Sequence, residues 1–308
     1  MKMRCIKQGP QNASSIILGC MRMPALSVAD AAGILCAAAD QGINFFDHAT
    51  CYGDGEAETR FGDAFPLTGL RREDLILQSK CGLHFDRKEF DWSRDDILTS
   101  AEGSLRRLKT DYLDVLLLHR PDLLFDPEEV AEAFDILHQQ GKVRFFGVSN
   151  VTPGQLELLR KYVKQPLVIN QLQFSLDQSQ LIDQGLYLNN QTTERSVDRD
   201  NGVLDYCRLR DITIQAWSPL QFGMFGGCFV DHPDFPELNQ VLATLGSKYG
   251  VTKAAVAIAW ILRHPAKMQA IAGTMNPRHL KEICAAADVE LTHQEWYELY
   301  LASGKFLP

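Results

Sequence analysis

Several patterns that would assign a function directly are missing from this 308-residue chain. None of its eight cysteines pairs as C-x-x-C, the spacing of zinc knuckles and thioredoxin-like sites, so we expect no metal site. No basic run accompanies the net charge of -8, so we do not expect nucleic acid as a partner. No apolar run reaches about 18 residues, and residues 1–9 lack the apolar core of a signal peptide. The sequence therefore predicts a cytoplasmic protein without a membrane span, with reduced and mostly buried thiols.

The composition is that of an ordinary globular protein, with 45% hydrophobic and 23% charged residues. Length alone would permit two domains, but an α/β barrel of about 250 residues is a single domain. No stretch of the sequence has the composition of a linker. We therefore expect one domain over residues 1–308.

Eight short apolar segments alternate along the chain with segments of helical periodicity. Nearly continuous apolar strands are covered on both faces, which indicates a parallel sheet. Eight such β/α units predict a (β/α)₈ barrel. A doubly wound sheet is the alternative, but no G-x-G-x-x-G follows the first strand. The expected strands are 16–18, 44–47, 75–79, 115–118, 143–148, 167–170, 213–217 and 268–272.

Two segments do not fit this repeat. Residues 185–202 are polar and lie between the sixth and seventh strands, and residues 222–234 carry glycines and aromatic residues after the seventh. Long loops in compact domains are usually functional or disordered. We expect both at the active face or its helical rim, with 185–202 shaping substrate access or contacting a partner.

Polar residues that suit proton transfer follow the second, third and fourth strands. Asp47 and Tyr52 follow the second strand, Lys80 the third and His119 the fourth. In a barrel the chemistry lies at the carboxyl ends of the strands, so these side chains should converge. Asp47 then has a partner in Lys80, and Lys80 should lower the pKa of Tyr52. With a histidine that can bind a carbonyl oxygen, the set predicts an oxyanion site that also donates a proton.

Each of these residues also has a plainer interpretation. Asp47 alone suits a structural turn, and His119 suits a strand end where its hydrogen bonds are satisfied. Lys80 alone suits a solvated loop, or the Schiff-base nucleophile of a barrel aldolase. We interpret His48 as structural. Cys51 and Cys81 flank the site in sequence, where packing is favoured and redox sensing is a minor hypothesis.

Six stretches, taken in order, resemble the aldo-keto reductase superfamily over nearly the whole chain: FFDHATCYG, QSKCG, LLLHRPD, GKVRFFGVSN, INQLQFS and QAWSPL. The resemblance is closest to a bacterial branch with Asp-His after the second strand, where much of the family has Asp-Thr. It implies the barrel already predicted, a nicotinamide cofactor bound without a Rossmann motif, and reduction of small-molecule aldehydes and ketones to alcohols.

The resemblance also implies residue roles. Tyr52 would be the general acid, Lys80 would depress its pKa, Asp47 would hold Lys80, and His119 would orient the carbonyl. Ser149, Asn150 and Gln171 would hold the nicotinamide carboxamide, with Trp217 stacked under the ring. The remaining cofactor contacts would be Gly19, Met21, Ser218, Leu220, Gly223, Gly273, Thr274, Arg278 and Glu282, the last four of them where the family holds the adenosine end.

The chain departs from the family at that end. Gly273 stands where a lysine usually faces the 2′-phosphate, and Ile283 where an asparagine contacts adenine. Arg278 or His279, with Thr274 as a donor, would replace the lysine, so NADPH is the expected cofactor and NADH the alternative.

Two broader expectations follow from the resemblance. The chain ends soon after the predicted helix 294–302, without the long tail that narrows the pocket in many relatives, so we expect an open site with broad affinity. A non-enzymatic, nicotinamide-binding regulatory subunit stays open, as does the choice between a monomer and a small homo-oligomer.

Overall fold

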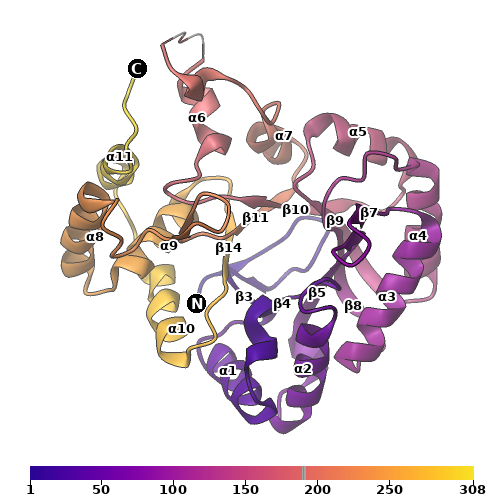
Figure 1. The fold of residues 1–308 in the computed structure, drawn as a ribbon. Coiled ribbons are helices and arrows are strands. Elements are labelled where there is room, and N and C mark those ends of the chain that lie inside the picture. Colours follow the sequence, from indigo (N-terminus) through magenta and orange to yellow (C-terminus); the bar gives the residue numbers. More distant parts are fainter. Residues whose placement is uncertain (189, 191) are drawn as a thin grey trace.

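The computed structural model describes residues 1–188, 190 and 192–308, and its centre is a closed barrel of eight parallel strands (Figure 1). The hydrogen-bonded order around the barrel is β10-β11-β14-β3-β4-β5-β8-β9. All eight predicted strands are present, so the predicted (β/α)₈ fold is confirmed. The strands are β3 (Ile16–Gly19), β4 (Phe45–Asp47), β5 (Ile76–Cys81), β8 (Leu113–Leu118), β9 (Val143–Ser149), β10 (Leu167–Gln173), β11 (Thr213–Trp217) and β14 (Gln269–Ala272).

The strands are apolar on both faces because each face meets a different part of the core. In β8, Val115 and Leu117 point into the barrel and pack in an inner cluster with Phe45 and Ile169. Leu116 and Leu118 belong to the outer cluster, between the sheet and the helices. This arrangement explains why the strand has no polar alternation in its sequence.

Helices surround the barrel, as Figure 1 shows. Side chains cap several of them: the Ser93 side chain accepts a hydrogen bond from the Asp96 amide, and Thr152 with Gln155 forms a capping box. The helices are α1 (Val28–Asp40), α2 (Glu56–Ala64), α3 (Arg94–Leu108), α4 (Pro127–Gln139), α5 (Pro153–Tyr162), α6 (Gln180–Leu186), α7 (Val203–Leu209), α8 (Pro236–Tyr249), α9 (Lys253–Arg263), α10 (Pro277–Cys284) and α11 (His293–Ala302).

Three two-stranded hairpins were not predicted, because two-residue strands are too short for a pattern of alternation. β1 (Met3–Arg4) pairs with β2 (Ala13–Ser14) ahead of the barrel. β6 (Leu83–His84) pairs with β7 (Glu89–Phe90), and β12 (Gln221–Phe222) pairs with β13 (Gly227–Cys228). The last two follow β5 and β11 directly, so they stand at the carboxyl ends of the strands.

The segment 185–202 lies among the outer helices, the second of the two places expected for it. Within it, Arg195 forms an ion pair of 2.8 Å with the buried Asp183 of α6, and Asp183 also accepts a hydrogen bond from Tyr300 of α11. Tyr187 donates to the Phe306 carbonyl. The segment therefore packs on α6, α11 and the last residues, and its described residues do not line the cavity below. That the segment shapes substrate access or contacts a partner stays a prediction; residues 189 and 191 lie outside the described residues.

None of the described helices is long and apolar enough to cross a membrane.

Candidate active site

Asp47, Lys80 and Tyr52 form one contact network at the carboxyl ends of β4 and β5. Lys80 Nζ lies 2.8 Å from Asp47 Oδ2 and donates to the Tyr52 hydroxyl at 3.0 Å and to the His48 carbonyl at 2.9 Å. After β4 the chain continues along β5, with the Thr50 amide bonded to the Lys80 carbonyl, and then turns. Gly55, at φ 89°, ends this turn where a Cβ would lie 2.6 Å from the Arg107 side chain. The turn returns Tyr52 over the end of the strand, as predicted.

Asp47 is held from below by a row of buried glutamines. Its Oδ1 accepts from Gln78 Nε2 at 2.6 Å and from Gln171 Nε2 at 3.1 Å. Both amides also donate to Gln215 Oε1, and Gln215 donates to Gln269 at 3.1 Å. The row crosses the barrel interior, where a carboxylate without donors would be costly. It orients Asp47 toward Lys80.

The charges of this network differ from the expectation in one respect. Burial by itself lowers the pKa of Lys80, but the ion pair with Asp47 outweighs it and the pKa lies above its usual value. Burial raises the pKa of Tyr52 to about 12, although Lys80 pulls it down. The prediction of a lowered pKa for Tyr52 is therefore wrong for this structure, because removing a phenolate from water costs more than one cation returns. The Tyr52 hydroxyl therefore stays protonated at neutral pH.

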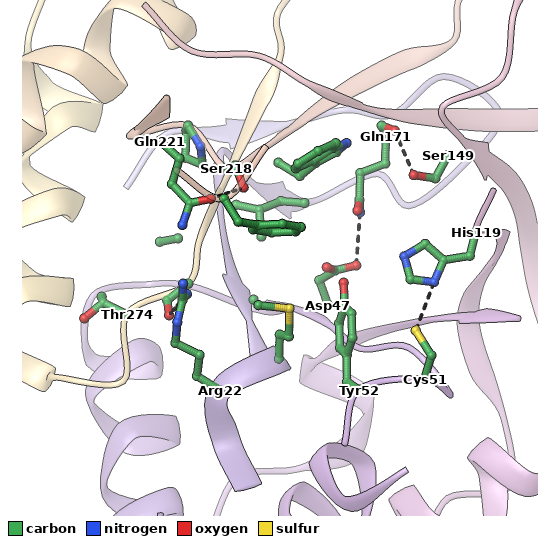
Figure 2. A pocket seen from close by; sticks show the side chains of 18 of the residues that line it. Arg22, Asp47, Cys51, Tyr52, His119, Ser149, Gln171, Ser218, Gln221 and Thr274 are labelled. Atoms are coloured by element: carbon green, nitrogen blue, oxygen red, sulfur yellow. Dashed lines mark hydrogen bonds between the residues drawn. The ribbon is translucent and has the colours of Figure 1, made fainter. Parts of the chain in front are cut away.

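His119 lies beside Tyr52 at the end of β8. The two rings meet edge to face with centroids 5.8 Å apart, and the Nδ1 of His119 lies 3.4 Å from the Cys51 sulfur (Figure 2). Burial, together with the charge of Lys80, keeps the pKa of His119 well below its usual value. The imidazole is therefore neutral and suited to donate one hydrogen bond without carrying a charge.

The residues predicted to hold a carboxamide lie together along the ends of β9, β10 and β11. Asn150, at φ 59°, donates to Ser149 Oγ at 2.7 Å and accepts from Trp217 Nε1 at 3.0 Å. Ser149 donates to the Gln171 carbonyl at 2.9 Å. Figure 2 shows Gln171 between Asp47 and Ser149, so this group adjoins the proton-donating network.

A cavity of about 1280 Å³ opens above these residues. Asp47, Tyr52 and His119 lie at one side of it in Figure 2, and Arg22 and Thr274 at the other. The volume exceeds the range of about 300–1,000 Å³ for one small ligand. The predicted site residues that line the cavity are Gly19, Met21, Asp47, Tyr52, His119, Ser149, Asn150, Gln171, Trp217, Ser218, Leu220, Gly273 and Thr274.

Five predicted residues lie outside this lining in the described part of the chain, one of them the exposed His279. Lys80 is fully buried beneath Tyr52. Gly223 belongs to the β12–β13 turn and accepts from Gln173 through its carbonyl at 2.9 Å. Arg278 and Glu282 pair with each other at 3.2 Å on the outer face of α10. The cavity therefore meets α10 through Ile283 and the residues before the helix, and not through this pair.

Sequence reasoning missed two arginines that line the cavity. Arg22 donates to the Gly273 carbonyl at 3.1 Å, and a Cβ at Gly273 would lie 2.7 Å from its Nη1. Arg22 thus occupies the space that a larger residue at Gly273 would need, where the family has its lysine. Arg120 follows His119 directly. Its place after a strand-end histidine was the available signal.

Two hairpins that the sequence analysis did not predict form apolar walls of the cavity. Phe85 and Phe90 of the β6–β7 hairpin and Met224 and Phe225 of the β12–β13 hairpin line the cavity and are largely exposed at its rim. The segment 222–234 therefore reaches the active face, as expected. His48 does not: it is buried against Phe61, with ring centroids 4.8 Å apart, in keeping with a structural role.

The parallel barrel holds a buried lysine–aspartate pair under a tyrosine, next to a histidine and a long cavity. This combination is typical of barrel oxidoreductases. The model of the aldo/keto reductase family matches residues 15–300. The chain belongs to the aldo-keto reductase family.

Similar proteins span almost the same length. An uncharacterized oxidoreductase, YcsN, of Bacillus subtilis is 36% identical over 275 residues, covering 85% of this chain and 84% of the relative. A 6-dehydroglucose reductase of Agrobacterium fabrum is 35% identical over 275 residues, covering 86% and 85%. A crystal structure of an aldo-keto reductase from Klebsiella pneumoniae in complex with NADPH has a TM-score of 0.77 at 28% identity, covering 97% of this chain and 94% of that one.

Proposed function

We propose that this protein reduces aldehydes and ketones to alcohols with a nicotinamide cofactor, with Tyr52 as the general acid. The observation that carries the proposal is the 3.0 Å contact between the Tyr52 hydroxyl and the buried Lys80 ammonium at the cavity floor. It gives a protonated phenol a neighbour that stabilises the phenolate left behind.

The cavity residues fit a dinucleotide. Gly19 and Gly273 line the cavity without side chains of their own, and Ser218 and Thr274 offer hydroxyls. Ser149, Asn150 and Gln171 would hold the carboxamide, Trp217 would lie against the ring, and Arg22 would face the phosphates in place of the family's lysine. We propose NADPH, with NADH as the alternative, because a structural relative is described in complex with NADPH.

The chain's own groups supply the proton and the orientation, while the bound nicotinamide supplies the hydride. A carbonyl oxygen between Tyr52 and His119 receives the proton from the Tyr52 hydroxyl as the carbon is reduced. Lys80 stabilises the phenolate, and Asp47 keeps Lys80 in place. In the tautomer of His119 in which the Cys51 thiol donates to Nδ1, the Nε2 proton of the neutral ring is free to hold the carbonyl.

The Schiff-base alternative has less support. A nucleophilic lysine must lose its proton and reach the substrate. Lys80 is fully buried, does not line the cavity in the described chain, and has a raised pKa. Trapping with borohydride and substrate should leave Lys80 unmodified.

The substrates we propose are small-molecule carbonyl compounds, among which sugar aldehydes merit first trial because a relative is named a 6-dehydroglucose reductase. We further propose a cytoplasmic enzyme that acts as a monomer or small homo-oligomer.

The test is Tyr52→Phe, with Tyr162→Phe at the end of α5 as control. We expect kcat for an aldehyde to fall about 10²–10⁴-fold in Tyr52→Phe, the range for loss of a general acid, while NADPH still quenches tryptophan fluorescence with unchanged Kd. Full turnover in Tyr52→Phe would remove the residue from this role. Cofactor binding by the wild type without turnover of any carbonyl would instead support a regulatory subunit.

A further inference from the structure

Arg120 is a half-buried cation in the cavity wall, and it has no role in the mechanism proposed above. It follows His119 at the end of β8 and lines the cavity. Its guanidinium lies 5.4 Å from the centre of the Trp217 ring. Within the described part of the chain it forms no ion pair and donates no hydrogen bond, whereas the part-buried Arg72 and Arg107 are each paired with a buried carboxylate at 2.8 and 2.7 Å.

The nearby acidic groups do not neutralise it. Asp47 pairs with Lys80. Asp122, two residues along, accepts hydrogen bonds from the amides of Trp92 and Leu124. Asp54 lines the cavity but is exposed, and it forms no ion pair with Arg120. The reaction end of the cavity therefore carries one uncompensated positive charge.

Such a charge is costly without a partner, since a cation removed from water needs an anion or acceptors to offset its lost hydration. Burial lowers the pKa of Arg120, which shows the same cost, while the guanidinium still stays charged near neutral pH. The walls around it are apolar and aromatic, so water and ions compete weakly there.

We propose that Arg120 binds a carboxylate of the substrate, so that the preferred substrates are aldehydes or ketones that carry one carboxylate close to the reacting carbonyl. This rests on the proposed function. One uncompensated guanidinium matches a single negative charge, and its planar fork suits a carboxylate bound through two hydrogen bonds. Phe85 and Phe225, which also line the cavity, suit a flat apolar body that carries the two groups.

The experiment compares 2-, 3- and 4-carboxybenzaldehyde with their methyl esters, which keep the shape and lose the charge. For the wild type we expect kcat/KM to favour the acid that fits over its ester by about 10- to 100-fold, the range of a charge-assisted hydrogen bond. Arg120→Met should bring this ratio to about one. Arg120→Lys should keep part of it. Arg22→Met, which removes the arginine beside Gly273 at the other side of the cavity, should leave the ratio and change cofactor binding.

Several results would overturn the proposal: a ratio near one in the wild type at all three ring positions, or a ratio unchanged in Arg120→Met. Weaker NADPH binding in Arg120→Met with an unchanged ratio would assign the guanidinium to the cofactor instead.

A binding measurement separates this failure from failure of the proposed function. Quenching of tryptophan fluorescence gives the affinity of the NADPH complex for the carboxybenzyl alcohols and their methyl esters without any turnover. If no aldehyde is reduced but the acids still bind more tightly in wild type than in Arg120→Met, the carboxylate site stands and the reductase does not. If aldehydes are reduced but the acids and their methyl esters bind with equal affinity, the reductase stands and the carboxylate site does not.

Discussion

Replacing Lys80 by methionine should destabilise the protein for a reason separate from catalysis. The change keeps an unbranched side chain, one atom shorter, but removes the ammonium that contacts Asp47, Tyr52 and the His48 carbonyl at 2.8, 3.0 and 2.9 Å. Asp47, 2% exposed, keeps only the amide donors of Gln78 and Gln171. Breaking a buried pair from one side costs about 3–5 kcal/mol. At roughly 2 °C per kcal/mol, this lowers Tm by about 6–10 °C.

The double variant Asp47→Asn with Lys80→Met tests that the cost is an uncompensated charge. It removes both charges, and the oxygen of the introduced amide can still accept from Gln78 and Gln171, so it should recover about 2 kcal/mol of the loss. Both variants should lack turnover. The matched control is Lys253→Met, which breaks the more exposed 2.6 Å pair with Asp231 and should cost less than about 1 kcal/mol.

Equilibrium unfolding in urea, with the slope compared between variants, measures these differences. If Lys80→Met is as stable as Lys253→Met, or if the double variant is no more stable than the single one, Asp47 does not carry a costly charge. The assignment of Lys80 as its essential partner would then be refuted.

Two further predictions concern protons in the site. Because the pKa of His119 lies well below its usual value and that of Tyr52 is raised to about 12, neither group titrates between pH 6.5 and 9. We therefore expect kcat/KM for an uncharged aldehyde to stay flat across this range in initial-rate assays; a step near pH 7 would contradict the neutral imidazole. Burial likewise raises the pKa of the Cys51 thiol to about 11, so little thiolate is present and hydrogen peroxide should inactivate wild type and Cys51→Ser equally. Selective protection of Cys51→Ser would revive the redox hypothesis.

The order of strands and helices was readable from the sequence because each is a local signal. The apolar run of β8, the Pro127 start of α4 and the capping residues Ser93 and Thr152 act within a few residues of themselves. The carboxyl ends of parallel strands must meet, so the positions of Asp47, Lys80 and His119 in the sequence were also enough to predict that they converge.

Other features depend on long-range contacts that leave no local pattern. Gln215 reaches Asp47 only through the amides of Gln78 and Gln171 on other strands. The positions of the β6–β7 and β12–β13 hairpins depend on the barrel strands β5 and β11 that precede them. The segment 185–202 is polar in sequence, yet Asp183 and Arg195 attach it to the outside of the fold.

The sequence by itself determined the barrel and the convergence of Asp47, Tyr52, Lys80 and His119, because periodicity and strand-end positions specify them, and its motifs indicated the family. The tertiary structure decided the protonation states of the site residues and which charged side chains have an ion-pair partner. Burial, which no residue sets alone, made Tyr52 a protonated acid rather than a phenolate. Folding also paired Asp47 with Lys80 and placed Asp122 next to the amides of Trp92 and Leu124. Neither carboxylate is therefore an ion-pair partner of Arg120 among the described residues.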